Sequence, residues 1–397
     1  MIFYFQKLNT AVNRQLSNHL HNLFIQKLSP FILIILLAIS CTKNEKTAPD
    51  TPDPVVPQYT KGVFVCNEGN FMYGNASLSY YNIEAQTVTN QIFFTTNNVP
   101  LGDVCQSMNI IDGKGYVVVN NSGKIQVIDT TTFKYSGTIT GLNSPRYIEK
   151  AGDNKLYITD LYSPLITIVD PSTLAKKGEI KVGKSTEMMA RVGNYIYTTS
   201  WSFQNKVYKI DTRTDSVVDS LEVTMQPNSI VSDKFNNIWV LSDGGYAGTP
   251  AGQVTATLTR IKTSTFKIDY IYELPTDESS PTKLCKDGLA ESLYFINGAW
   301  GGSVPMGGIC KVTLLNSESP VVEMIIPEGG KLFYGLGIDP INSDIYVSDA
   351  IDYTQKGVVY RYSSKGDLIH QFQADLIPGY FCFKYPVSDI VFIRGHI

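Results

Sequence analysis

The chain has 397 residues, of which 43% are hydrophobic and 17% charged, and its formal net charge is -3. This composition is ordinary for a folded protein and excludes disorder over most of the length. The slight negative charge leaves no basic stripe for a phosphate backbone, so we expect no nucleic-acid partner.

The first 40 residues have the pattern of an export signal. Basic residues precede the apolar run Phe31–Ile39, which is too short to span a bilayer. The run leads into Leu37–Cys41, which resembles a bacterial lipobox. We therefore expect residues 1–40 to be a lipoprotein signal peptide and Cys41 to carry the lipid, as the only membrane attachment. A plain secretory signal with an incidental cysteine is the alternative.

Residues 41–59 follow as the lipidated cysteine and a flexible tether, because Thr42–Pro57 holds four prolines and no apolar periodicity. Five cysteines remain after Cys41, an odd number without CxxC spacing, which argues against a disulfide framework or a zinc site. We expect single buried thiols, although an exported chain could pair two of them. They are Cys66, Cys105, Cys285, Cys310 and Cys382.

A short strand motif returns seven times between residues 60 and 397. Each copy is centred on an aromatic residue, and the seven anchors are Phe64, Tyr116, Tyr157, Tyr197, Trp239, Tyr294 and Tyr346. Their spacings of 52, 41, 40, 42, 55 and 52 residues are typical of a four-stranded propeller blade and too long for leucine-rich or ankyrin repeats. We predict an all-β fold, a seven-bladed β-propeller over residues 60–397.

Each blade is expected to have four strands, A to D from the axis outward, with the anchors on strand B. Strand C follows about nine residues downstream of strand B, a spacing that suits one short strand and the loop after it. The innermost strands, A, should begin near Gln106, Pro145, Thr186, Pro227, Pro281 and Tyr334. These six are one short of the seven anchors, so the remaining inner strand must come from elsewhere in the chain.

The segment Tyr385–Ile393 has the pattern of an inner strand with no strand B after it. We expect it to complete the first blade by pairing beside Gly62–Asn67, which is followed by strands over Ala76–Tyr81 and Thr87–Phe94. Such pairing would close the ring and remove exposed sheet edges.

Strand alternation divides the connections between two ends of the propeller. The A-to-B and C-to-D turns open at one end, here the turn end, and are short and polar, as in Asp112–Lys114 and Asp233–Asn237. The B-to-C loops and the crossings from D to the next A open at the other, here the loop end. Six of the seven B-to-C loops carry large aromatic residues, namely Phe71, Tyr73, Tyr162, Trp201, Phe203, Tyr246, Trp300 and Tyr353.

Aromatic rings on loops of a rigid scaffold favour a binding surface, although several could instead pack over neighbouring loops as blade caps. Nearer the axis, the crossings supply hydrogen-bonding side chains that we call the polar ring: Gln106, Arg146, Glu187, Asn228, Thr282 and Tyr334. Flat apolar surface around separated donors and acceptors suits a large, polar, mostly uncharged ligand.

Catalytic motifs are missing from the sequence. The expected mature chain retains His370 and His396 only, without a nucleophile partner, and no GxSxG, HExxH or phosphate-loop pattern occurs. Four carboxylates at loop entrances, Glu68, Asp103, Asp349 and Asp352, could form a calcium cluster, but such groups more often cap turns. We predict a binding protein with no catalytic residue, cofactor or metal.

The stretches GVFVCNEGN, LGDVCQSM, GYVVVNNSGKIQVID and SPRYIE, together with the repeat, resemble the YncE-like seven-bladed propeller lipoproteins of Bacteroidota. Within that group the chain is most similar to the cobalamin-binding propellers that partner the outer-membrane vitamin B12 transporter. The resemblance implies an outer-membrane lipoprotein that binds cobalamin or another corrinoid at the loop end. Display of the lipoprotein on the cell surface is one form of this localisation. It also implies delivery of the ligand to a TonB-dependent transporter.

Two other functions remain open on the sequence alone. One is a scaffold that binds a glycan or protein partner with the same aromatic surface. The other is a metal-dependent propeller enzyme of the lactonase or lyase kind, which the scarcity of histidine disfavours.

Overall fold

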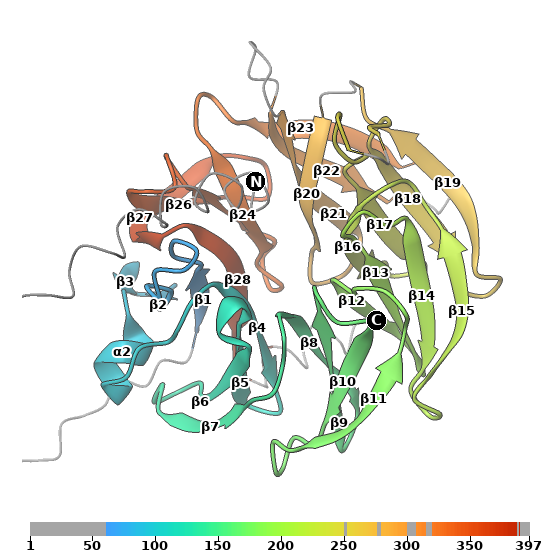
Figure 1. Ribbon diagram of the computed structural model, residues 1–397. Helices are drawn as coiled ribbons and strands as arrows, with labels where there is room; N and C mark the ends of the chain where they lie inside the picture. The colour runs from blue at the N-terminus through green and yellow to red at the C-terminus, as the bar shows by residue number, and fades with distance from the viewer. Residues whose placement is uncertain are drawn as a thin grey trace, which may run out of the picture. The chain divides into compact units, whose positions relative to one another are not determined.

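The computed structural model describes residues 61–249, 252–275, 279–299, 307–314, 320–386 and 389, within the compact unit Val56–Ile397. These residues form seven four-stranded antiparallel sheets arranged as the blades of a propeller (Figure 1). The expected signal peptide, Cys41 and the tether lie outside the described residues. In the described part, no helix is both long and apolar enough to cross a membrane.

The strands follow the expected order from the axis outward in every blade. The innermost strands are β4 (Cys105–Ile111), β8 (Pro145–Gly152), β12 (Met189–Val192), β16 (Pro227–Ser232), β20 (Ser279–Lys286), β24 (Phe333–Ile338) and β28 (Pro378–Lys384). The second strands are β1 (Gly62–Asn67), β5 (Lys114–Val119), β9 (Lys155–Asp160), β13 (Tyr195–Ser200), β17 (Ile238–Ser242), β21 (Ser292–Ala299) and β25 (Ile345–Asp349).

The third strands are β2 (Ser77–Asn82), β6 (Lys124–Asp129), β10 (Leu165–Val169), β14 (Lys206–Asp211), β18 (Thr257–Lys262), β22 (Gly308–Thr313) and β26 (Lys356–Tyr362). The outer strands are β3 (Thr87–Thr89), β7 (Tyr135–Ile139), β11 (Lys176–Lys181), β15 (Ser216–Glu222), β19 (Lys267–Glu273), β23 (Val321–Pro327) and β27 (Leu368–Leu376). Two short helices, α2 (Ile92–Asn97) and η1 (Asn120–Ser122), lie in connections.

The core lies between the blades and is built on the repeated aromatic anchors. All seven anchors are at most 1% exposed, as their place on the second strand requires. A ring of this size buries roughly 150–250 Å² of surface, so the anchors are a principal source of hydrophobic stabilisation. The seven-bladed fold predicted from their spacing is confirmed.

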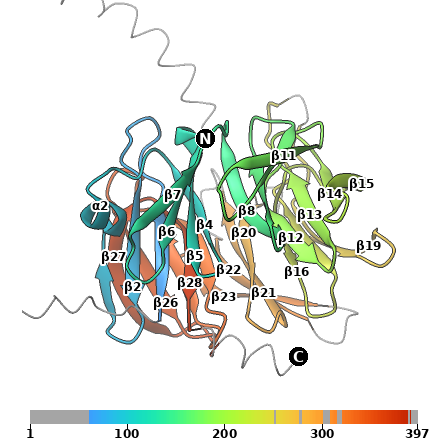
Figure 2. The same cartoon turned by 90° about the horizontal axis from the view of Figure 1, so that it is seen from below.

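The ring is closed in the first blade by the C-terminal strand, but at different residues from those expected. Strand β28 pairs antiparallel with β1, with Gly62 opposite Lys384 and Asn67 opposite Pro378, so the assignment of Tyr385–Ile393 was wrong. Because β27 passes into β28 through the single residue Ile377, in the left-handed conformation, the inner strand begins earlier than a longer crossing would allow. Strand β28 also packs beside β4 and β24, which completes the circle of inner strands (Figure 1). The view turned by 90° shows β28 beside β4 from the side (Figure 2).

The outer edge of the first blade also differs from expectation. Residues Thr87–Phe94 were predicted as one strand, but the strand ends at Thr89 and α2 begins at Ile92. Gln91 has a left-handed backbone conformation that turns the chain, and the side chains of Ile92 and Phe93 then pack into the hydrophobic core beside β2. Burial of these two residues therefore overrides their β propensity.

The five cysteines in the described residues are all free thiols. Four are buried and Cys285 is partly buried. The expectation of unpaired thiols is met.

Candidate functional site

Six of the seven inner strands have a register shift in their pairing with the second strand. In β28 the shift lies at Pro378/Tyr380. In the other five it lies at Cys105/Ser107 in β4, Pro145/Ile148 in β8, Pro227/Ser229 in β16, Thr282/Cys285 in β20 and Phe333/Leu336 in β24. Such bulges re-aim side chains and are common beside functional sites. Here the residues inside the shifts include Gln106, Arg146, Asn228, Lys283 and Tyr334, and all five line one cavity.

This axial cavity has a volume of about 730 Å³, within the range of small-molecule sites. It extends along the inner strands, since Asn228 near the start of β16 and Ser232 at its end both line it. Aromatic rings of Tyr147, Tyr380 and Phe381 form part of the wall. The cavity therefore combines a polar ring at the loop end with a partly apolar interior.

Arg146 is the centre of a hydrogen-bonded group within the polar ring. Its Nε lies 2.9 Å from both carboxylate oxygens of Glu187, its Nη2 donates to Glu187 Oε1 at 2.6 Å, and its Nη1 donates to Gln106 Oε1 at 2.5 Å. The side chains of Arg146 and Glu187 are only 12% and 4% exposed. The pair thus neutralises its own charge in a site largely shielded from water.

A second polar group surrounds Tyr334. Its hydroxyl donates to Glu68 Oε2 at 2.8 Å, and its ring meets that of Tyr353 edge to face at 5.7 Å between centroids. The amine of Lys283 lies 5.4 Å from the centre of the Tyr334 ring. Burial lowers the pKa of Lys283, while the negative charge of Glu68 opposes that effect. Neither Glu68 nor Lys283 was predicted as a ligand-binding residue.

Trp201 and Asp243 form a third group beside the cavity. The indole Nε1 donates to Asp243 Oδ2 at 3.1 Å, and the backbone N–H of Gly245 donates to Oδ1 at 2.9 Å. Burial raises the pKa of Asp243 to about 6, although these hydrogen bonds favour its ionised form. A buried carboxyl group with a raised pKa thus lies next to Trp201 of the cavity wall.

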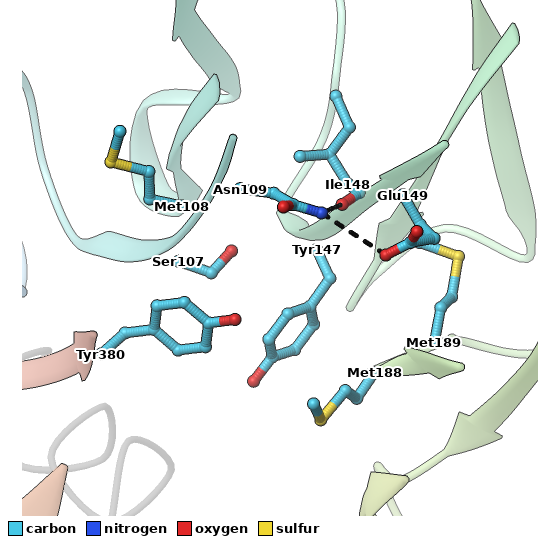
Figure 3. Close-up of a pocket in the computed structure, with 9 residues that line it drawn as sticks. All are labelled: Ser107, Met108, Asn109, Tyr147, Ile148, Glu149, Met188, Met189 and Tyr380. Atoms are coloured by element: carbon cyan, nitrogen blue, oxygen red, sulfur yellow. Dashed lines mark hydrogen bonds between the residues drawn. The ribbon is translucent and has the colours of Figure 1, made fainter. Parts of the chain in front are cut away.

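Deeper in the fold, a small side pocket of about 60 Å³ lies where β4, β8, β12 and β28 approach (Figure 3). The rings of Tyr147 and Tyr380 lie side by side there, with centroids 6.2 Å apart. Asn109 Nδ2 donates to the carbonyl of Ile148 at 3.1 Å and reaches a carboxylate oxygen of Glu149 at 3.4 Å. Tyr147, Glu149 and Tyr380 also line the axial cavity, so the two spaces share a wall.

The structure separates the predicted site residues into two groups. Seven line the axial cavity: Gln106, Arg146, Glu187, Trp201, Asn228, Tyr334 and Tyr353. Five lie in B-to-C loops with large exposed fractions, namely Phe71 (39%), Tyr73 (79%), Tyr162 (53%), Phe203 (42%) and Tyr246 (39%). Trp300 lies outside the described residues. The loop aromatics and the polar ring share the loop end, but these five loop residues take no part in the cavity wall.

The four carboxylates considered for calcium are engaged in hydrogen bonds. Asp349 accepts from the backbone amides of Leu332 and Ile351, at 3.0 and 2.8 Å, and Asp352 caps its own turn. Asp103 accepts from the amide of Met72, while Glu68 accepts from Tyr334. Among the described residues, no group of three or more histidine, cysteine or acidic side chains could hold a metal ion.

Comparison with known families gives one match over most of the chain. The model of a domain of unknown function, DUF5074, matches residues 61–390. No protein of curated function matches significantly.

Solved structures support the fold at low identity. A quinonprotein alcohol dehydrogenase-like protein from Bacteroides thetaiotaomicron is 16% identical with a TM-score of 0.62, over 82% of this chain and 79% of that one. A protein provisionally named 6-phosphogluconolactonase, from Bacteroides uniformis, is 12% identical with a TM-score of 0.61, over 82% and 100%. Hydrazine synthase of Kuenenia stuttgartiensis is 13% identical with a TM-score of 0.57, over 70% and 88%. Such identities carry the propeller fold and no function.

Proposed function

We propose that this chain, which belongs to the DUF5074 family, is a lipid-anchored outer-membrane protein that binds cobalamin or a related corrinoid at its loop end and delivers it to a TonB-dependent transporter. The observation that carries the proposal is the exposure of five aromatic rings at the same end of the blades as the polar ring. The function is capture of a ligand, without catalysis.

The chemistry of the two groups of residues suits a corrinoid. In the ligand implied by the resemblance, amide arms surround a flat apolar disc. Exposed rings such as Tyr73 and Tyr162 offer apolar faces with a polar edge, and the amides of Gln106 and Asn228 offer both donors and acceptors. A corrinoid whose flat disc stacks on the exposed aromatic rings, and whose amide arms point toward the polar ring, would contact both groups of residues.

The first-blade loop that carries Phe71 and Tyr73 is held in place by its own contacts. Asn70 Nδ2 donates to the carbonyl of Tyr353 at 2.8 Å, and the amide of Met72 donates to Asp103 Oδ2 at 2.8 Å. Because the loop is ordered before binding, fixing these rings against a ligand costs little conformational entropy.

The test is calorimetric titration of the purified protein with cyanocobalamin. We expect a dissociation constant of micromolar or tighter for the wild type, and roughly fivefold weaker binding for Tyr73→Ala, because one stacked ring contributes about 1 kcal/mol. Phe235→Ala is the matched control, since Phe235 is 43% exposed but lies in the turn before β17, at the turn end. Absence of binding, or equal weakening in both variants, would refute corrinoid capture at the loop end.

Delivery and anchoring are tested in the host cell. Deletion of the gene should reduce uptake of labelled cobalamin when the vitamin is limiting. Cys41→Ala should release the protein from the membrane fraction and reduce uptake similarly. Unchanged uptake in the deletion strain would remove transporter delivery from the proposal while leaving ligand binding to the calorimetric result.

The same titration separates the competing functions. Binding of oligosaccharides with no response to cyanocobalamin would favour the glycan scaffold, which the exposed rings would also serve. Turnover of lactones that is abolished by a chelator would favour the metal-dependent enzyme.

A further inference from the structure

Lys283 has an unusual backbone conformation beside the axial cavity. It lies inside the β20 register shift between Thr282 and Cys285, with a positive φ of 60°. A residue with a side chain at such a φ is strained, and the conformation persists only where the surrounding structure enforces it. Here the bulge places the lysine in the cavity lining, at the level of the polar ring.

The carboxylates near this lysine accept hydrogen bonds from other side chains. Arg146 occupies both oxygens of Glu187, and the Tyr334 hydroxyl occupies Oε2 of Glu68. In the described part of the chain, the Lys283 amine has a contact with the Tyr334 ring but no hydrogen-bond acceptor or ion pair. The charged and titratable groups that face it are Glu68, Arg146, Glu187 and Cys285, with Tyr334 beneath it.

Lys283 is partly buried, and its amine has three donors and no protein acceptor among the described residues in the wall of the cavity, so water or a ligand must supply the acceptors. Arg146 differs, since all three nitrogens of its guanidinium donate hydrogen bonds within the polar ring. The interior next to Lys283 offers room and apolar surface, with Tyr380 and Phe381 in the wall of the 730 Å³ cavity. A ligand that completes the site would therefore pair an acceptor with an apolar body.

We propose that the axial cavity is a binding site for a small organic oxyanion, with an apolar body against the aromatic wall and a carboxylate or phosphate paired with Lys283. The site is distinct from the exposed loop aromatics and stands whether or not the loop end takes a corrinoid. Its specificity follows from the neutralised Arg146–Glu187 pair, which leaves Lys283 as the cation available to the ligand at this level of the cavity.

The test uses three probes of similar shape, benzoate, phenyl phosphate and neutral benzamide, titrated into the full-length protein and followed by calorimetry. We expect saturable binding of at least one of the two anions and at least tenfold weaker binding of benzamide. The anion that binds more tightly distinguishes a carboxylate from a phosphate ligand. Binding of benzamide as tight as that of the anions, or binding of none of the three, would overturn the proposal.

Variants then assign the binding to the lysine. Lys283→Met should weaken anion binding at least tenfold, whereas Lys283→Arg, which keeps the charge, should retain most of it. Lys286→Met is the control, because Lys286 lines the cavity from the last position of β20 and donates to Ser232. Equal weakening in the Lys283→Met and Lys286→Met variants would contradict the assignment.

A measurement on the wild type covers the case in which Lys283→Met does not fold. Reductive methylation of lysines, read by mass spectrometry, should be slowed at Lys283 by the tighter-binding anion and left unchanged by benzamide. Unslowed methylation at saturating anion would refute the site. Oxyanion binding without cobalamin binding would refute the proposed function alone, and the converse result would refute this site alone.

Discussion

Two aspartates flank the same strand, β17, and their oxygens are used to different extents. At the turn end, Asp233 accepts from the amides of Phe235 and Asn237, from Asn237 Nδ2 and from the buried indole of Trp239, all at 2.8–3.0 Å. At the loop end, Asp243 accepts from Gly245 and from Trp201, which is partly exposed in the cavity wall.

The difference indicates that the two ends of the propeller have different roles. At the turn end of this blade, the carboxylate oxygens of Asp233 accept hydrogen bonds from neighbouring residues, and these bonds fix the turn and the buried Trp239 behind it. At the loop end, a buried carboxyl is less completely compensated, and this residual cost is typical of a site that interacts with something else. Each of the following changes tests that contrast.

Asp233→Ala should give the largest loss of stability. It leaves the Trp239 indole and two backbone amides without their acceptor in a buried turn, which we expect to cost about 4 kcal/mol of unfolding free energy. Urea denaturation measures the loss, and cyanocobalamin binding to the folded fraction should not change. Asp233→Asn, which keeps one acceptor, should lose less. A loss of unfolding free energy below about 1 kcal/mol would show that the hydrogen bonds of Asp233 do not stabilise the turn end as proposed.

Asp243 should make stability depend on pH in the opposite direction from a salt-bridged carboxylate. Its pKa in the folded protein is about 6, above its value of 3.8 in the unfolded chain, so the folded state binds the proton more tightly. The resulting stabilisation is complete below pH 3.8 and is lost as the pH rises through about 6. A shift of two units corresponds to about 3 kcal/mol at most.

The measurement is urea denaturation of the wild type and Asp243→Asn at several pH values between 4 and 8. Relative to the variant, the wild type should gain stability as the pH falls. Other titrating groups cancel in this difference. Parallel stability curves would mean that Asp243 is not held in its neutral form by burial.

Removal of an exposed aromatic ring should have the smallest effect on stability at either end, whereas its effect on cobalamin binding should differ between the two ends. Tyr73→Ala and Phe235→Ala remove rings that are 79% and 43% exposed, so each should change the unfolding free energy by no more than about 0.5 kcal/mol. Thermal unfolding measures this directly. A larger loss in Tyr73→Ala would indicate that its ring supports the first-blade loop, which would weaken its use as a binding probe.

The blade repeat and the polar ring could be predicted from the sequence because both follow from strand periodicity. An anchor such as Tyr157 must be buried at the centre of each blade, and a residue such as Arg146, just after a crossing, must face the axis. Lys283 and Tyr380 were missed for different reasons. Lys283 faces the cavity because of a bulge, and a bulge depends on how two strands pair.

Tyr380 was missed because the closing strand was placed too late. Both Tyr385–Ile393 and β28 have alternating apolar residues, so alternation alone did not distinguish them. A second signal was present: β8 and β16 each begin with a proline, Pro145 and Pro227, and so does β28, with Pro378. Proline suits the first position of an inner strand, where its missing N–H breaks no ladder bond.

Closure by β28 also has a consequence for how the chain must be assembled. The inner edge of β1 carries unpaired backbone groups until the residues from Pro378 onward arrive, and these are separated from β1 by more than 300 positions. During synthesis or translocation from the N-terminus, the first blade therefore waits for almost the entire polypeptide before its sheet is complete. Over that interval the unpaired edge of β1 can pair with strands of other chains and aggregate. A chaperone that covers unpaired strand edges would therefore protect this protein at its first strand.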